Sequence, residues 1–205
     1  MNCLLRMRRE QHDAGFSLAE LLVVISLLSV VGGIVLSAII TTTHIERRND
    51  SVVLQRTVAQ TALQRMGRDL TVADPLTAAA ASDATMKVYR DGYCETHRWY
   101  VTSGSDLALT VNRYPASTTC TNASGTLTSL GTTVVAEDVA NGATALFTYS
   151  KWNGLQNQRV AVASPVASTA VSGVDRVEIE LQLTTLSNAP IIEEESVDLR
   201  NVEIQ

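Results

Sequence analysis

The sequence is poor in the residues that most often carry chemistry. Of 205 residues, three are histidines, three are cysteines and 4% are aromatic. The histidines, His12, His44 and His97, lie far apart, so no pair has the spacing of metal ligands. The sequence also lacks a Gly-rich phosphate loop and a Gly-x-Ser-x-Gly nucleophile motif. We therefore expect no enzyme, no metal site and no cofactor.

Basic residues are not in excess. The sequence has 16 Lys and Arg against 21 Asp and Glu, which gives a net charge of -5. Binding to the phosphates of nucleic acid needs a basic surface, so we expect no direct contact with nucleic acid. The hydrophobic share of 45% is enough for one compact domain.

One apolar run stands out because Leu21 to Ile40 contains no charged residue. At about 1.5 Å per residue, a helix over residues 16–40 would span the ~30 Å hydrocarbon core of a bilayer. The run is longer than the apolar region of about 7 to 15 residues in a secretory signal peptide. Its length also disfavours a buried helix of a soluble protein. We predict one transmembrane helix, surrounded by membrane lipid.

A single carboxylate, Glu20, lies at the start of this run. A charged side chain at the middle of a membrane costs about 2.5 to 3.5 kcal/mol, so it would need a partner there. At the edge of the membrane it could instead be solvated among the lipid headgroups. The position of Glu20 alone leaves both interpretations open.

Residues 15–24 read Gly-Phe-Ser-Leu-Ala-Glu-Leu-Leu-Val-Val and resemble the processing motif of type IV prepilins and pseudopilins. The resemblance implies that residues 1–15 are a leader and that a prepilin peptidase cuts between Gly15 and Phe16. It also implies that the new amine of Phe16 is methylated. Glu20 would then pair with the N-terminal amine of a neighbouring subunit as the helices pack into a filament.

Beyond the apolar run, the pattern predicts an amphipathic helix that ends near Asp74, before Pro75. Its apolar face needs a cover, either the rest of the chain, as in pilins, or a coiled-coil partner. Residues 49–51, Asn-Asp-Ser, could interrupt the helix or start a second one. The apolar face consists of Leu54, Val58, Ala59, Ala62, Leu63, Met66 and Leu70.

The residues after this helix show the alternation of half-buried strands, most clearly from Val177 to Leu183. Thr77 to Thr85 is expected to be a connecting loop, and Glu193 to Glu195 a solvated one. Residues 75–205 should form a mainly antiparallel β head domain. Further strands are expected at 86–90, 97–102, 107–114, 132–139, 146–149 and 197–204.

The expected fold class is therefore α+β and similar to type IV pilins. A long N-terminal helix over residues 16–74 would have a membrane-spanning half and an amphipathic half, packed on an antiparallel sheet. Arginines flank both ends of the apolar run, so the positive-inside rule does not decide the orientation. The size and the cysteine content of the C-terminal part favour a head domain outside the cytoplasmic membrane.

Removal of the leader would remove Cys3 and leave Cys94 and Cys120 as the only cysteines. In an exported domain, one remaining pair predicts a disulfide. Cys94 and His97 could suggest a thiol and its base, but three residues apart in a strand they point to opposite faces. We do not expect them to act together in catalysis.

Five aromatic residues fall close together between positions 89 and 114. They could form a binding surface, but the alternation of Trp99 with Val101 favours core packing. The five are Tyr89, Tyr93, Trp99, Tyr100 and Tyr114.

The resemblance implies a structural subunit of a type IV pilus or a type II secretion-like filament. Leu63 to Leu70 is similar to the end of the long helix in J-type minor pseudopilins and W-type minor pilins, which favours a minor subunit. The implied partners are other pilins or pseudopilins, the prepilin peptidase and an inner-membrane assembly platform. The alternative is an uncleaved, signal-anchored protein that binds a ligand at the cell surface.

Overall fold

The computed structural model describes residues 17–115, 119–120, 123–167, 169–186 and 189–199. The chain divides into two compact units, residues 1–47 and 48–205. One helix, α1 (Leu18–Thr71), contributes residues to both units. It continues through residues 49–51, so the predicted interruption there does not occur.

The helix ends at Thr71, three residues earlier than the sequence predicted. Residues 73–79 form a strand instead, and Pro75 lies within it. This strand is at the edge of its sheet, where a residue without an amide hydrogen is tolerated. The residue before proline disfavours helical angles, so Asp74 could not extend the helix in any case.

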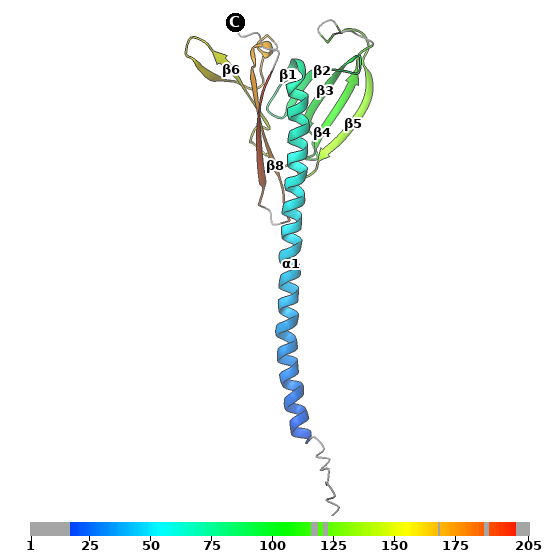
Figure 1. Ribbon diagram of the computed structural model, residues 1–205, viewed down its shortest axis with the longest axis vertical. Helices are drawn as coiled ribbons and strands as arrows, with labels where there is room; N and C mark the ends of the chain where they lie inside the picture. The colour runs from blue at the N-terminus through cyan, green and yellow to red at the C-terminus, as the bar shows by residue number, and fades with distance from the viewer. Residues whose placement is uncertain (1–16, 116–118, 121–122, 168, 187–188, 200–205) are drawn as a thin grey trace, which may run out of the picture. The chain divides into compact units, whose positions relative to one another are not determined.

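The second unit contains two antiparallel sheets. The first has the order β1-β2-β3-β4-β5, and the second has the order β7-β6-β8-β9. Figure 1 shows the last turns of α1 running between the two sheets. The first sheet consists of β1 (Ala73–Ala79), β2 (Asp83–Arg90), β3 (Tyr93–Val101), β4 (Leu107–Arg113) and β5 (Thr128–Ala136). The second consists of β6 (Phe147–Asn153), β7 (Gln158–Val162), β8 (Arg176–Leu183) and β9 (Ile191–Asp198).

The core of the second unit joins the helix to both sheets. Ala59, Ala62 and Met66 of α1 are completely buried, and Leu70 follows them one turn later. They belong to one hydrophobic cluster with the inward side chains of both sheets. The same chain therefore covers this part of the amphipathic face, as the resemblance to pilins implied. Leu54, at the start of the predicted face, stays exposed.

The predicted strand Val177 to Leu183 is confirmed as β8, because its alternation of large apolar and polar residues matches a sheet with one buried face. Residues 86–90, 97–102, 107–114, 132–139 and 146–149 overlap β2, β3, β4, β5 and β6. The loop predicted at Thr77 to Thr85 is wrong, because β1 and the start of β2 occupy it. Strand β7 was not predicted.

The last strand was predicted six residues too late. β9 covers Ile191–Asp198, so the triple glutamate lies in a strand and the solvated loop predicted there is wrong. Residues 200–204 lie outside the described residues. The glutamates fit a strand because Glu193 forms an ion pair of 2.9 Å with Arg56 of α1. Glu195 lies against α1 where Gly67 leaves space, and burial raises the pKa of its carboxyl.

Two further predictions concern β3. The disulfide is confirmed, since Cys94 and Cys120 are bonded and close a loop with a sequence separation of 26. Trp99 is fully buried, as predicted. Core packing is wrong for Tyr89 and Tyr93, which are exposed and lie beside the turn that joins β2 to β3.

Candidate functional site

The N-terminal end of α1 is closed by a reciprocal pair of hydrogen bonds. The backbone N–H of Glu20 donates to the hydroxyl of Ser17 at 3.2 Å. In return, the N–H of Ser17 donates to Oε2 of the Glu20 carboxylate at 3.1 Å. Ser at the N-cap and Glu three residues later form a capping box, which satisfies amides that the first turn leaves unpaired. Glu20 therefore has a partner within its own chain.

Four hydroxyl side chains in the apolar run or directly after it donate hydrogen bonds to carbonyls within the helix. The hydroxyl of Ser26 donates to the carbonyl of Val23, and that of Ser29 donates to the carbonyl of Ile25, both at 2.8 Å. Thr41 and Thr42 donate in the same way to carbonyls one turn earlier. Each of these four hydroxyl groups therefore has an acceptor within the helix, as an environment without water requires.

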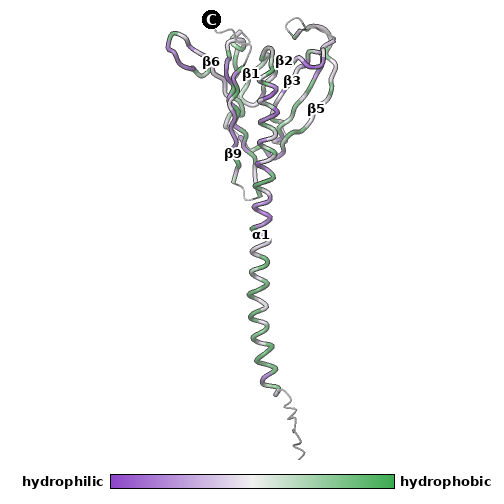
Figure 2. Tube along the Cα trace, in the orientation of Figure 1, coloured by the Kyte–Doolittle hydropathy of each residue, from purple (hydrophilic) through white to green (hydrophobic). Residues whose placement is uncertain are grey.

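The apolar side chains of this segment are not covered by the first unit. All described residues from 17 to 47 are exposed, including every large apolar side chain of the run. Figure 2 shows the apolar stretch of α1 and the polar residues that follow it. In the described part of the chain, α1 is the one helix long and apolar enough to cross a membrane. The N-terminal helix fits a single-pass membrane anchor.

Comparison with known families identifies this segment. Residues 11–36 match the family model of the prokaryotic N-terminal methylation motif. This is the type IV prepilin and pseudopilin signature. No curated protein and no solved structure matches the chain. With one long N-terminal helix packed on antiparallel sheets, the chain is type IV pilin-like in architecture.

The predicted site residues of this pilin-like chain are distributed as follows. Glu20 lies in the first turn of α1, at the start of the apolar run. Gly15 and Phe16, where cleavage and methylation are expected, lie outside the described residues, as does Cys3. Cys94 and His97 point to opposite faces of β3, since Cys94 bonds to Cys120 and His97 faces α1. Pilin-type families are generally structural rather than enzymatic.

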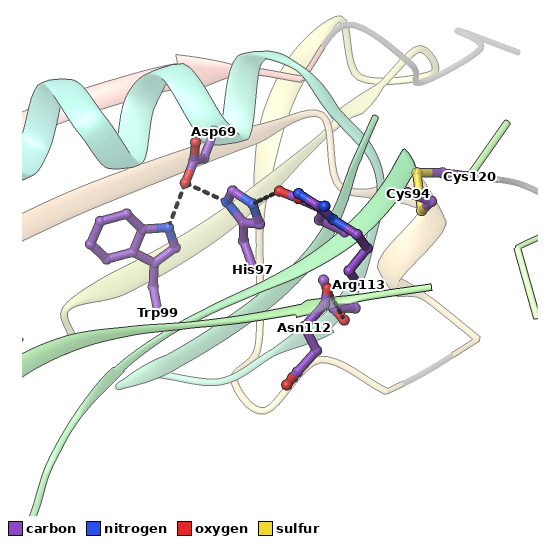
Figure 3. A network of polar contacts seen from close by, with 9 residues as sticks. Asp69, Cys94, His97, Trp99, Asn112, Arg113 and Cys120 are labelled. Atoms are coloured by element: carbon purple, nitrogen blue, oxygen red, sulfur yellow. Dashed lines mark hydrogen bonds and ion pairs between the residues drawn. A yellow bond between two sulfur atoms is a disulfide. The ribbon is translucent and has the colours of Figure 1, made fainter. Parts of the chain in front are cut away.

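The structure also contains a buried polar cluster that links the pilin-like helix to the first sheet (Figure 3). Nδ1 of His97 lies 2.8 Å from Oδ2 of Asp69 in α1, and Nε2 lies 3.3 Å from Oε2 of Glu95. The indole N–H of Trp99 donates to the same oxygen of Asp69 at 3.2 Å. From β4, the guanidinium of Arg113 donates to Oε1 of Glu95 at 2.9 and 2.6 Å.

These contacts determine the charge of the cluster. Both ring nitrogens of His97 face a carboxylate oxygen, an arrangement that suits an imidazolium, which donates from both nitrogens. Burial alone would lower the pKa of His97, but the carboxylates of Asp69 and Glu95 outweigh burial and raise it. Burial would raise the pKa of Glu95, and the hydrogen bonds from Arg113 and His97 lower it instead. With His97 protonated, the positive charges of His97 and Arg113 cancel the negative charges of Asp69 and Glu95.

This cluster has no room for a substrate, because Asp69, Glu95 and His97 are each at most 4% exposed. Its hydrogen bonds instead join the last turns of α1 to the first sheet. The cluster was not predicted from the sequence. The alternation Glu95, His97, Trp99 places three polar-tipped side chains on one face of a strand, and that spacing was the available signal.

Proposed function

We propose that this protein is a minor pilin or pseudopilin, processed by a prepilin peptidase and assembled through its N-terminal helix into a type IV pilus or a type II secretion-like filament. The observation that carries the proposal is the methylation motif, placed on a helix whose large apolar side chains between residues 18 and 45 are uncovered. In this proposal, lipid covers these side chains before assembly, and the helices of other subunits cover them in the filament. The similarity of Leu63 to Leu70 to minor subunits supports the minor role.

In this proposal, residues 1–15 form the leader, and cleavage between Gly15 and Phe16 frees the amine that is then methylated. Before assembly, the helix spans the cytoplasmic membrane once and the head domain lies outside. The Cys94–Cys120 disulfide supports that placement, because disulfides persist in oxidising compartments. The partners are the peptidase, an inner-membrane assembly platform and other pilin or pseudopilin subunits.

Glu20 would have two tasks in this proposal. Its Oε2 accepts the N–H of Ser17 in the capping box. An ionised carboxylate has about four acceptor positions, so a second interaction does not require the first to break. The positive amine of a neighbouring Phe16 is the partner expected in a filament, where neither group is well solvated.

Three variants separate the cap from the ion pair. Glu20→Gln keeps an acceptor for the capping box but removes the charge, because Gln also forms capping boxes. Glu20→Ala removes both, and Ser17→Ala removes the cap but keeps the charge. Leader cleavage and the amount of protein in filaments sheared from cells are measured for each variant by quantitative mass spectrometry.

We expect normal cleavage in all three variants. Incorporation should be lost in Glu20→Gln and Glu20→Ala and kept in Ser17→Ala, because the charge and not the cap is needed between subunits. Wild-type incorporation of Glu20→Gln would show that the carboxylate serves only the cap. An intact leader in wild-type protein would instead indicate a signal-anchored surface protein.

A further inference from the structure

The hairpin of β6 and β7 ends in two exposed apolar side chains. Leu155, in the turn, is 100% exposed, more than any other large apolar side chain of the described residues. Trp152, on the same hairpin, is 42% exposed. Both line one hollow together with Lys151. We call residues 151–158 the hairpin tip, and its uncovered apolar side chains indicate a contact that the chain does not make with itself.

The hairpin tip is held in a fixed shape by polar groups. Oδ1 of Asn153 accepts the N–H of Leu155 at 3.1 Å and that of Gln156 at 3.4 Å. The side-chain amide of Gln158 donates to the side chain of Gln156 at 3.1 Å. None of these bonds uses the side chain of Leu155. The turn therefore presents this side chain outward in an ordered way, and its burial against a partner loses little conformational entropy.

The base of the hairpin is fixed by interactions that neutralise its other charges. The carboxylate of Asp175 accepts the N–H of Trp152 at 2.6 Å and is paired with Arg159. Arg159 also lies 3.1 Å from Asp198 of β9. Because these groups balance one another, the base offers no excess charge to a partner.

Lys151 is the single charged residue of the hairpin tip. It forms no ion pair with a described residue. The tip is therefore positive, although the whole chain has a net charge of -5. A local positive charge beside exposed apolar side chains favours a partner that is both apolar and anionic.

The size and shape of the tip distinguish between the partners of this kind. A specific protein interface buries about 800 Å² on each partner. Leu155 and Trp152 lie at the end of a turn that is otherwise polar, and two side chains offer far less apolar area than that. A bilayer surface needs no matching pocket, because its lipids adapt to the inserted group. The tip therefore fits a lipid surface better than a protein groove.

The residue types agree with this choice. Trp is enriched where the headgroups of a bilayer meet its apolar core, because its ring is amphipathic. A Leu side chain gains free energy by entering the boundary of the acyl chains. A Lys is attracted by anionic headgroups. Trp152, Leu155 and Lys151 supply one of each within five positions of the chain.

The hairpin is also accessible. β7 lies at the end of the second sheet and pairs with β6 alone. Figure 1 shows the hairpin projecting from the second unit, away from α1. In the part of the chain that the structure describes, no other strand lies beside β7, so a flat surface can approach the tip.

We propose that the hairpin tip is a membrane-contact site that inserts Leu155 and the ring of Trp152 into the surface of a bilayer with anionic headgroups, where Lys151 meets the lipid phosphates. Two apolar side chains and one charge give weak, reversible binding. The contact requires neither leader cleavage nor a filament, and none of its residues belongs to α1. It therefore goes beyond the proposed function, and the two proposals can fail separately.

The fluorescence of tryptophan tests the insertion directly. The full-length chain is held in nanodiscs of phosphatidylcholine and mixed with vesicles of phosphatidylcholine and phosphatidylglycerol that carry brominated acyl chains. Bromine quenches a tryptophan only at short range. The chain has two tryptophans, and Trp99 is completely buried. Quenching therefore reports on Trp152, and Trp152→Phe supplies the matched protein in which Trp99 alone remains.

We expect quenching of the wild type by these vesicles and none of Trp152→Phe. Leu155→Ser should weaken the apparent affinity by about tenfold or more, because the inserted side chain is lost. Lys151→Gln should weaken it about fivefold, and vesicles of phosphatidylcholine alone should bind the wild type equally weakly. The control Ile192→Ser removes a side chain that is 50% exposed on β9 and should leave the quenching unchanged.

Several results would overturn the proposal. One is a wild type that the anionic vesicles do not quench, which is also the result expected if the tip fits a protein pocket instead. Others are equal affinities of Leu155→Ser and the wild type, or equal affinities for anionic and neutral vesicles. Folding of each variant is verified by the intact Cys94–Cys120 disulfide. Quenching by protein whose leader is never cleaved in cells would keep the membrane contact and overturn the proposed function.

Discussion

The charge of the buried His97 depends on pH. It is buried between Asp69 of α1 and Glu95 of β3, and Arg113 of β4 completes the cluster. Its pKa is raised in the folded protein, while the unfolded value is about 6.5. The stability it contributes is therefore complete below about pH 6.5 and is lost as the pH rises through the folded value. When His97 loses its proton, the carboxylates of Asp69 and Glu95 are left with Arg113 as the one cation of the cluster.

We therefore expect the free energy of unfolding to fall as the pH is raised above about 6.5. His97→Gln cannot titrate, so its stability should be lower at pH 6 and should change little over the same range. The measurement is denaturant unfolding of the full chain in detergent at several pH values. A wild-type stability that is constant between pH 6 and pH 9 would show that His97 does not carry this charge. Glu95 acts in the opposite range, since its lowered pKa makes stability fall only as the medium becomes acidic.

At the scale of elements, α1 should contribute unequally to stability along its length. Met66 is completely buried between the sheets, whereas Val53 is 65% exposed on the same helix. Met66→Ala should cost about 2 to 5 kcal/mol of unfolding free energy, because it leaves a cavity. Val53→Ala should change it by less than about 0.5 kcal/mol. Equal effects in denaturant unfolding would mean that the sheets do not cover the end of the helix.

The disulfide fastens the segment after β4 to β3. For its sequence separation of 26, loop entropy predicts a contribution of about 3 to 4 kcal/mol. Replacement of Cys94 and Cys120 by serine should lower the unfolding free energy by this amount. A reducing agent should destabilise the wild type similarly and leave the double variant unchanged. A wild type that is insensitive to reduction would contradict the bond's contribution.

The elements that the sequence predicted are those determined by local pattern. β8 alternates large apolar and polar side chains, and α1 repeats apolar residues every fourth position, so both could be predicted. β1 contains three alanines and a proline, and its pattern resembles a loop. β9 carries Glu193 and Glu195 on its inward face, and they fit there only because Arg56 and Gly67 of α1 lie opposite. Sequence alone does not show such partners.

In the candidate site, too, the features set by local sequence could be predicted and those set by distant partners could not. Glu20 and the apolar run are contiguous in sequence, and a motif of that kind can be found without a structure. The cluster of Asp69, Glu95 and His97 joins residues 26 or more positions apart across α1 and β3, and the pairing depends on the packing of the helix. The capping box at Ser17 could have been predicted from the spacing of Ser17 and Glu20, because both of its residues lie in one helical turn.

At the scale of the molecule, two types of helix surface coexist. In the second unit, α1 is buried by its own sheets, while in the first unit its apolar side chains are exposed. A membrane and then a filament would supply the missing cover, and the second step would depend on a free, processed N-terminus. Gly15 and Phe16 are the residues at which this proposal is decided.

The most direct test is a mass spectrum of the N-terminal peptide from membranes and from filaments sheared off the cell surface. We expect a peptide that begins at methylated Phe16 in the sheared fraction, at low abundance relative to the main subunit. A peptide that retains residues 1–15, found in membranes alone, would contradict the assignment as a filament subunit.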